Sequence, residues 1–436
     1  RPDYINKNIL RDRLLGINAK IRLCDGREVC QINFDNAATT PPLKSVVEYI
    51  ELMSNYYASV GRGTGQKAAF TTNLYNGARE YLLNFFNIKN NSEYTTIFVN
   101  NTTDGINKIA RTLICKNDIV LTTRMEHHSN DLPWRANGIV DYVEVDKNGR
   151  LDYYSLNEKL NQYNGRVKIL SITGASNVTG YINDIHKISK LAHNHGAKIV
   201  VDGAQLVPHI KIDIPGNNID ENIDFLVFSA HKLYAPFGSG AIIGKKEDFN
   251  LKIPDKQGGG TVELVKDWDA KYLDSPEKDE AGTPNFFGVL SMIKSLKELN
   301  EIGFDYLISR EKKLFNILND EIKKIPNVIT YADTKNIDDR LGIMVFNIDG
   351  MYHKDVATIL AMERGISVRH GWFCAHPYCR RLMGIDEIEA EKYLYDHTKR
   401  MYGMVRVSLS PYNTIEEINE LLNEIEYISK KYRKVK

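Results

Sequence analysis

The stretch Ile223-Asp224-Phe225-Leu226-Val227-Phe228-Ser229-Ala230-His231-Lys232 joins an apolar run to a lysine. Upstream, a second apolar run, Ala197-Lys198-Ile199-Val200-Val201, ends in Asp202. Short apolar runs of this kind are typical of buried strands, and the carboxyl ends of parallel strands meet at one edge of a sheet. We therefore expect Lys232 and Asp202 to lie on neighbouring strands.

This pairing of a lysine with an aspartate indicates a particular chemistry. A lysine at the edge of a buried strand is costly to desolvate, and its commonest role there is a Schiff base with a carbonyl cofactor. A carboxylate such as Asp202 can pair with the pyridinium nitrogen that pyridoxal 5'-phosphate needs to act as an electron sink. The alternative is a lysine at a strand end and an aspartate that caps a turn. The two residues together favour the cofactor.

The surrounding sequence alternates between strands and helices from about residue 33 to residue 240. A helix after Val99 has Ile106, Ile109, Ala110 and Leu113 on one face, and Gly196 is expected to end another helix. This alternation predicts an α/β fold with a mostly parallel sheet covered by helices on both faces. The expected strands, besides the run before Ser229, are 95–99, 118–122, 167–173 and 197–202.

A chain of 436 residues is too long for one compact core, so we expect two domains. The pattern changes near residue 295, and the later part predicts a smaller α+β domain. Its expected elements are helices over 289–299, around Val356 and from Ile415 to Ile428, with strands over 341–347 and 403–409. We predict an N-terminal segment (1–32) with a short helix and a hairpin that packs with the small domain, a large cofactor-binding domain (33–295) and a small domain (296–436). Residues 247–284 are expected to form an irregular loop that touches a partner.

Composition narrows the class of protein. The chain has 57 basic and 56 acidic residues, a net charge of +1, and 42% hydrophobic residues. This balance predicts neither a nucleic-acid partner nor a membrane partner, and no apolar stretch reaches the roughly 20 residues that span a bilayer. Five sparse cysteines do not resemble a disulfide framework, so we expect a reducing, cytoplasmic location.

Two further motifs fall at strand ends. Asn101-Thr102-Thr103-Asp104-Gly105 precedes an amphipathic helix, whose N-terminus could hold a phosphate or could simply be capped. In Met125-Glu126-His127-His128-Ser129-Asn130, a histidine could stack on an aromatic cofactor and move protons. A metal site is the weaker alternative, because adjacent histidines point apart and no further ligand set accompanies them. His209 is interpreted as structural.

Five further motifs follow one another along the chain. They are Asn33-Phe34-Asp35-Asn36-Ala37-Ala38-Thr39-Thr40, Ser176-Asn177-Val178-Thr179-Gly180, Asp202-Gly203-Ala204-Gln205, Glu280-Ala281-Gly282-Thr283-Pro284-Asn285 and Arg406-Val407-Ser408-Leu409-Ser410-Pro411-Tyr412-Asn413-Thr414. Together with the motifs quoted above, this ordered set resembles the fold-type I, class-V aminotransferase-like enzymes of the cysteine desulfurase and selenocysteine lyase group (group II-like). The resemblance covers nearly the whole chain from about residue 33 and implies a seven-stranded-type sheet in the large domain.

The resemblance implies a role for each matching residue. Lys232 would bind pyridoxal 5'-phosphate covalently, Asp202 would hold its pyridinium, Gln205 its phenolic oxygen, and His127 would stack on the ring. Asn177 and Arg406 would fix the substrate amino acid, with Arg369 and Arg62 as further substrate contacts near the entrance. The phosphate would lie against Thr102, Thr103, Ser229 and His231, together with Thr283 from the other subunit, which implies a homodimer.

The same resemblance places Cys374, in Arg369-His370-Gly371-Trp372-Phe373-Cys374-Ala375-His376-Pro377, at the nucleophile position of desulfurases. A thiolate there would remove sulfur from L-cysteine as a persulfide and leave alanine, for transfer to a possible acceptor protein. A small buried hydrophobe is the alternative role for this cysteine. The other functions considered are an aminotransferase, an epimerase or another C–S or C–Se lyase on a different amino acid, and a non-catalytic scaffold.

Overall fold

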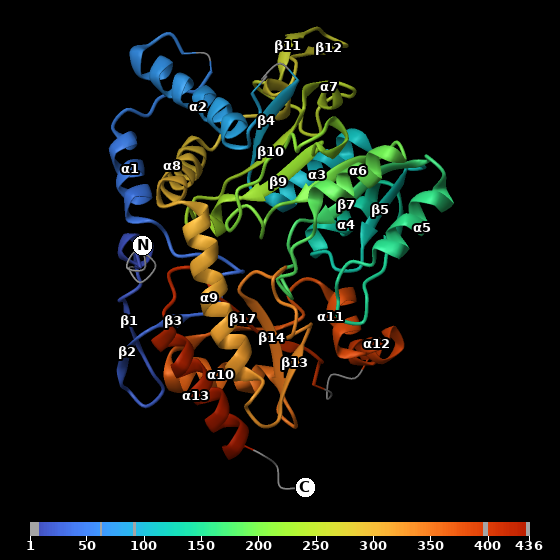
Figure 1. Cartoon of the computed structure of the whole chain (residues 1–436). Helices are drawn as coiled ribbons and strands as arrows, with labels where there is room; N and C mark the ends of the chain where they lie inside the picture. Colours follow the sequence, from blue (N-terminus) through green and yellow to red (C-terminus); the bar gives the residue numbers. More distant parts are fainter. Residues whose placement is uncertain (1–7, 62, 90–92, 396–399, 433–436) are drawn as a thin grey trace.

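The computed structural model describes residues 8–61, 63–89, 93–395 and 400–432. Figure 1 shows a large α/β part above a smaller α+β part; helix α8 (Phe286–Ile302) lies in the upper part and leads into α9 (Phe304–Ile322), which runs down into the lower part. The predicted α/β fold with a mostly parallel sheet is confirmed, since β10 alone among the sheet's described pairings runs antiparallel to its neighbours.

The large sheet has seven strands in the order β4-β10-β9-β8-β7-β5-β6. Thr173 pairs with Asp202, and Asp202 pairs with Val227, so the polar strand ends lie side by side. The order in the chain differs from the order in the sheet because the crossovers run through helices. The bounds are β4 (Tyr94–Val99), β5 (Ile119–Thr123), β6 (Ile139–Val143), β7 (Val167–Thr173), β8 (Lys198–Asp202), β9 (Phe225–Ser229) and β10 (Gly240–Lys245).

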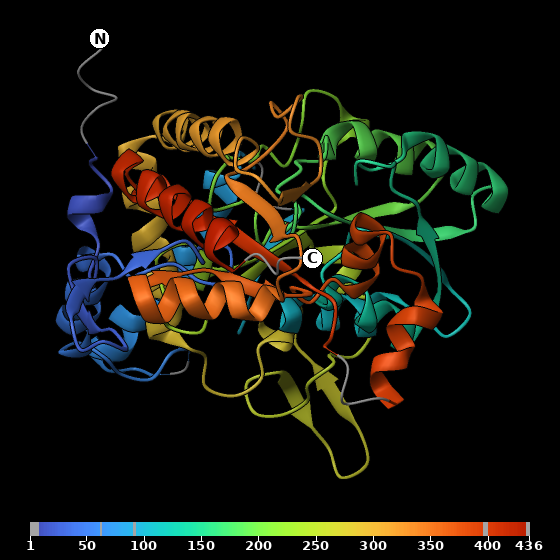
Figure 2. The same cartoon turned by 90° about the horizontal axis from the view of Figure 1, so that it is seen from below.

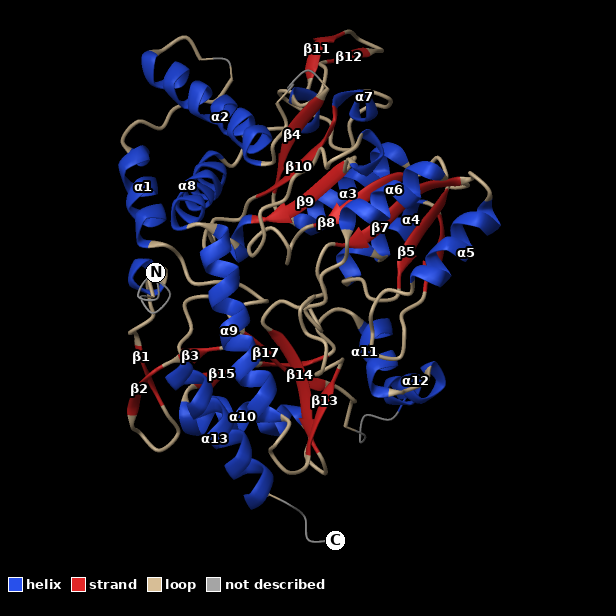
Figure 3. Cartoon of the chain, viewed as in Figure 1, coloured by secondary structure: helices blue, strands red, loops and turns tan. Residues whose placement is uncertain are grey.

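Both faces of this sheet are apolar, which explains why its strands read as continuous hydrophobic runs. Along β8, Val200 packs with the side chains of α3, α4 and α7, whereas Ile199 and Val201 belong to the core on the opposite face. Figure 3 shows the resulting layers, with helices on the two sides of the strands. The helices of this part are α1 (Lys44–Ser54), α2 (Gln66–Phe85), α3 (Thr102–Leu113), α4 (Leu132–Asn137), α5 (Tyr153–Tyr163), α6 (Ile185–Asn194), α7 (Lys246–Phe249) and α8 (Phe286–Ile302).

The C-terminal part contains a four-stranded antiparallel sheet in the order β13-β14-β17-β16. Three long helices pack their apolar side chains against it in a separate core. Its strands are β13 (Val328–Tyr331), β14 (Ile343–Ile348), β16 (Arg369–Gly371) and β17 (Met404–Ser408). Its helices are α9 (Phe304–Ile322), α10 (His353–Arg364), α11 (His376–Met383), α12 (Glu387–Tyr395) and α13 (Ile415–Lys431).

The N-terminal residues contribute a hairpin of β1 (Lys20–Arg22) and β2 (Glu28–Cys30). The next strand, β3 (Ile32–Asn33), pairs in parallel with β15 (Ile366–Ser367). A 3-10 turn (Arg11–Arg13) precedes the hairpin. The domain boundaries at residues 33 and 296 stay a prediction.

The segment expected to be irregular contains regular structure, so that expectation was wrong. Within 247–284, β11 (Val262–Val265) and β12 (Ala270–Tyr272) pair as an antiparallel hairpin. Figure 2 shows this hairpin projecting from the body of the molecule. Each strand is short and mostly exposed, so neither carries the apolar run by which buried strands are detected. In the part of the chain that is described, no helix is long and apolar enough to cross a bilayer.

Candidate active site

One cavity of about 620 Å³ lies where the predicted strand ends meet the C-terminal part. Asp202 ends β8 and Ser229 ends β9, and the short turn Ala230–Lys232 follows β9 directly. The C-terminal part supplies the opposite wall, through β16, β17 and the loop between β16 and α11. The predicted residues that line the cavity are Thr102, Thr103, His127, Asn177, Asp202, Gln205, Ser229, His231, Lys232, Arg369, Cys374 and Arg406.

Lys232 and Asp202 have pKa values shifted toward neutrality by their surroundings. Burial lowers the pKa of Lys232 to about 8, against the opposing attraction of Asp202. Burial also raises the pKa of Asp202, which is 4% exposed and accepts a 2.9 Å hydrogen bond from the Ala204 backbone N–H through Oδ1. A lysine with a lowered pKa has a larger fraction of nucleophilic free amine at neutral pH.

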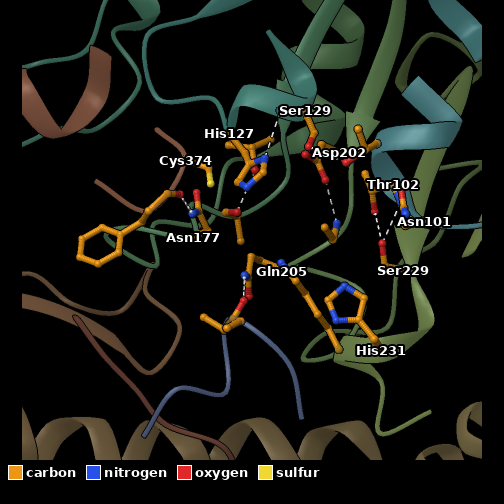
Figure 4. Close-up of a pocket in the computed structure, with 18 of the residues that line it drawn as sticks. Asn101, Thr102, His127, Ser129, Asn177, Asp202, Gln205, Ser229, His231 and Cys374 are labelled. Carbon is orange, nitrogen blue, oxygen red and sulfur yellow. Dashed lines mark hydrogen bonds between the residues drawn. The ribbon is translucent and has the colours of Figure 1, made fainter. Parts of the chain in front are cut away.

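His127 lies between Asp202 and Cys374 in the view of Figure 4. Burial, followed by the charge of Lys232, lowers its pKa to about 4, so the ring is neutral at pH 7. The Ser129 backbone N–H donates to His127 Nδ1 at 3.1 Å, which places the ring proton of the neutral form on Nε2. The preceding Glu126 is buried and accepts hydrogen bonds from Asn130 and from the Thr173 backbone, which anchors the His127 segment to β7.

The opposite end of the cavity collects hydroxyl groups at the N-terminus of α3. The Ser229 hydroxyl accepts a 2.8 Å bond from the Thr102 backbone N–H and contacts the Thr102 hydroxyl at 2.7 Å. Thr103 Oγ1 lies 2.7 Å from Ser129 Oγ. Hydroxyls beside a helix N-terminus form a site suited to an anion. Burial lowers the pKa of the nearby His231 to about 4.

Arg406 lies on β17 and is 3% exposed. Its Nη1 donates to the Asn177 carbonyl at 2.9 Å, and its Nη2 donates to Asp35 Oδ1 at 3.1 Å. Arg369 binds the same carboxylate, with Nη2 2.7 Å from Asp35 Oδ2. Arg406 Nε is buried without a hydrogen-bond partner. One carboxylate shared by two guanidiniums leaves a net positive charge and a free N–H donor, which suits a carboxylate ligand.

Cys374 belongs to a short segment, residues 372–376, that we call the cysteine loop. Its carbonyl accepts a 2.6 Å hydrogen bond from the His128 backbone N–H, and the Phe373 carbonyl accepts one from Asn177 Nδ2 at 2.8 Å. Phe373 and Cys374 have φ angles of 49° and 55°, a left-handed conformation that is uncommon for residues other than glycine. Such strain costs about 1–3 kcal/mol per residue and persists only where surrounding contacts hold it.

The two cysteines of this region differ in their surroundings. Cys374 is exposed and lines the cavity. Cys379 is buried, its thiol contacts the Trp372 carbonyl at 3.2 Å, and burial raises its pKa. A thiol with a raised pKa is a poor nucleophile, so Cys379 is a packing residue of α11.

Some predicted positions lie elsewhere. Thr283 does not line the large cavity and lines a smaller one of about 120 Å³ on the other side of Asn100. Arg62 lies outside the described residues. His209 forms a 2.6 Å contact with buried Glu311. His128 turns away from His127 and packs on His376, with ring centroids 4.6 Å apart. Within the described ranges, no group of three or more His, Cys, Asp or Glu side chains could hold a metal ion.

Several cavity residues and their partners were not assigned a role from the sequence, and four of them matter for the site. They are Asp35, Ser129, Phe373 and Ala37, whose carbonyl accepts a 2.7 Å bond from Gln205 Nε2. Asp35, Ala37 and Ser129 all lie within motifs that were used to predict the site. Their membership in these motifs could therefore have indicated that they lie near the cavity. Phe373 is one of two aromatic residues that directly precede Cys374, so its place beside the thiol was available from the sequence, whereas its contact with Arg406 was not.

Comparisons with known proteins show the family of the chain. The family model for "Aminotransferase class-V" matches residues 32–421. The chain belongs to this family. A probable cysteine desulfurase of Halalkalibacterium halodurans is 32% identical over 375 residues, 84% of this chain and 89% of the relative. One of Pyrococcus abyssi is 32% identical over 413 residues, 92% of this chain and 95% of the relative.

Solved structures give the same assignment at the level of the fold. The apo cysteine desulfurase of Thermococcus onnurineus has a TM-score of 0.80 at 30% identity, covering 92% of this chain and 95% of that one. The cysteine desulfurase CsdA of Escherichia coli has a TM-score of 0.79 at 27% identity, covering 97% and 98%. Members of this family use pyridoxal 5'-phosphate, so this class-V chain is a pyridoxal-phosphate-dependent enzyme.

Proposed function

We propose that this enzyme is a cysteine desulfurase, which cleaves the C–S bond of L-cysteine, releases alanine and keeps the sulfur on Cys374 as a persulfide. The observation that carries this proposal is the position of Cys374. An exposed thiol lines the same cavity as Lys232, Asp202 and Arg406, although it comes from a different part of the chain. The relatives that are named as probable cysteine desulfurases support the same reaction.

The side chains of the cavity fit the cofactor. Asp202 is buried with a carboxylate oxygen beyond the one that accepts the Ala204 N–H, which suits a pyridinium nitrogen. Lys232, with its lowered pKa, would bind the cofactor aldehyde, and Gln205 and His127 would flank the ring. Thr102, Thr103, Ser229 and His231 would hold the phosphate at the α3 end. When bound, the cofactor supplies an electron sink for the bond-breaking step.

The remaining groups would bind and orient the substrate. Arg406 would bind its α-carboxylate through Nε and a free Nη hydrogen, because its other bonds to Asn177 and Asp35 hold the guanidinium in place. The free amine form of Lys232 would move a proton at the substrate carbon. The neutral His127 ring would donate a hydrogen bond through its Nε2–H to a group bound in the cavity.

In the sulfur-transfer step, Cys374 Sγ attacks the substrate sulfur as a thiolate. An S–S bond forms, the substrate C–S bond breaks, and the carbon that loses sulfur takes up a proton. L-cysteine and the Cys374 thiol thereby become L-alanine and a Cys374 persulfide, with no external oxidant or reductant. Cys374 itself is exposed, although its neighbours in the loop are buried, so its thiol is accessible to a sulfur-acceptor protein, which we propose as the next partner.

The experiment is incubation of the pyridoxal-phosphate-loaded enzyme with a panel of amino acids, reading sulfide, alanine and keto acid together. With L-cysteine and a thiol reductant, we expect sulfide and alanine in equal amounts and no keto acid. Keto acid from another amino acid would instead identify an aminotransferase. The absence of both products, with the cofactor bound, would favour the scaffold alternative.

We also propose that the enzyme is a homodimer. Three aromatic side chains near one another are at least 40% exposed: Tyr56, Tyr57 and Phe70. The Tyr57 ring lies 5.1 Å from the ring of Phe287, which follows Thr283 by four residues in the sequence. Exposed aromatic clusters of this kind mark protein interfaces. A second copy covering them could bring its Thr283 toward the phosphate end of the cavity. Sedimentation velocity should give twice the chain mass, and Tyr57→Glu should give the monomer.

We further propose a cytoplasmic location and two structural units. All five cysteines are free, which is consistent with a reducing compartment such as the cytoplasm. A distinct apolar cluster formed mostly by residues after 310 supports a small unit over 296–436 beside a large unit over 33–295, although a second cluster joins the two. Limited proteolysis would locate the boundary between the two units.

A further inference from the structure

We propose that Phe373 is a positioning residue that ties the cysteine loop to Arg406, and that it thereby sets the selectivity for substrates with a free α-carboxylate. This inference rests on the proposed function. Phe373 precedes Cys374 in the chain and lines the same cavity. Its aromatic ring has no part in the reaction steps described above.

The side chain of Phe373 supports the arginine directly. The Arg406 guanidinium carbon lies 5.0 Å from the centre of the Phe373 ring. This is the geometry of a cation–π contact, which strengthens where water is excluded. Both groups are well buried, with Phe373 8% and Arg406 3% exposed. Because the ring offers no hydrogen-bond acceptor, it restrains the guanidinium without occupying its N–H donors, and Arg406 Nε has no hydrogen-bond partner.

The backbone of Phe373 contacts the other substrate-binding residue. Its carbonyl accepts the 2.8 Å hydrogen bond from Asn177 Nδ2, and the Asn177 carbonyl in turn accepts from Arg406 Nη1 at 2.9 Å. Phe373, Asn177 and Arg406 therefore form a closed set of contacts, with the nucleophilic residue joined to it through one peptide bond. The positive φ angles of Phe373 and Cys374 require such support.

Electrostatics explain why an aromatic ring suits this position. Arg406 already shares Asp35 with Arg369, so a second carboxylate near the guanidinium would neutralise the charge that a substrate carboxylate needs. The ring stabilises the cation without adding a full negative charge. We therefore expect Phe373 to affect binding of the α-carboxylate more than the sulfur-transfer step.

The test uses the pyridoxal-phosphate-loaded enzyme and two probes without sulfur, L-alanine and L-alaninamide, whose binding is followed through the visible absorption of the cofactor. Phe373→Leu should weaken alanine binding about tenfold and leave alaninamide within about twofold. Phe373→Tyr, which keeps the ring, should bind alanine within about twofold of the parent. Trp372→Leu is the matched control, because the neighbouring Trp372 ring packs on His376 and should leave alanine affinity unchanged.

The proposal is overturned if Phe373→Leu binds alanine as the parent does, or if it loses alanine and alaninamide affinity equally, which would indicate a general loosening of the cavity. If Phe373→Leu does not bind the cofactor, Phe373→Met serves as the second apolar variant. Because neither probe contains sulfur, these results do not depend on whether the enzyme releases sulfide. With L-cysteine, KM should rise in Phe373→Leu while kcat falls by less than about threefold.

Discussion

Two regions of the cavity position their reactive side chains in different ways. Lys232 and Asp202 lie at the ends of adjacent parallel strands whose side chains are packed on both faces. Cys374 lies in a loop with two left-handed residues, held by hydrogen bonds from His128 and Asn177. The first region depends on core packing, and the second on a few long-range polar contacts. Substitutions should therefore affect the two regions differently.

The largest effect is expected at the strand end. Lys232→Ala should lose the visible absorption that depends on the lysine–cofactor bond, and alanine production from cysteine should fall at least about 1000-fold. The fold should be retained, since a lysine with its pKa lowered by burial contributes little to stability. Absorption spectra and circular dichroism measure both quantities. Retained absorption in the variant would contradict the role of Lys232.

A smaller effect, on stability, is expected in the second region. Asp35→Asn removes the carboxylate shared by Arg369 and Arg406 and leaves the Arg406 cation buried without a counterion. The free energy of unfolding of the apoenzyme should fall by about 3 kcal/mol. The matched control is Asp25→Asn, which removes an exposed ion pair with Arg27 and should leave the free energy of unfolding nearly unchanged. If urea denaturation shows the same loss of stability for Asp35→Asn and Asp25→Asn, Asp35 does not stabilise the buried Arg406 cation.

The same contrast decides how much could be predicted from the sequence. The strands around Val200 and Val227 were predictable because a buried parallel strand is a continuous apolar run, and their polar ends then fell at one edge. The contact of Phe373 with Arg406 was not predictable, because it joins β17 to a loop whose conformation follows from long-range hydrogen bonds. The hairpin of β11 and β12 was missed because its strands are short and exposed.

The smallest predicted effect is a pH dependence. The folded pKa of His127 is about 4, below the usual 6.5, so its neutral form stabilises the fold above pH 6.5 and this contribution is lost as the pH falls toward 4. Between pH 7.5 and 5.0, the parent apoenzyme should lose about 2 kcal/mol more stability than His127→Gln. Urea denaturation at the two pH values measures this difference. Equal losses would place His127 in contact with solvent.

The central claim, that Cys374 is the sulfur-accepting thiol of this cavity, is tested most directly by alanine production from L-cysteine in Cys374→Ala. We predict that the variant binds the cofactor with unchanged visible absorption and forms alanine at least about 100-fold more slowly. Cys379→Ala, which removes the buried thiol of the same region, should retain most of the activity. Alanine production by Cys374→Ala at the parent rate would contradict the assignment.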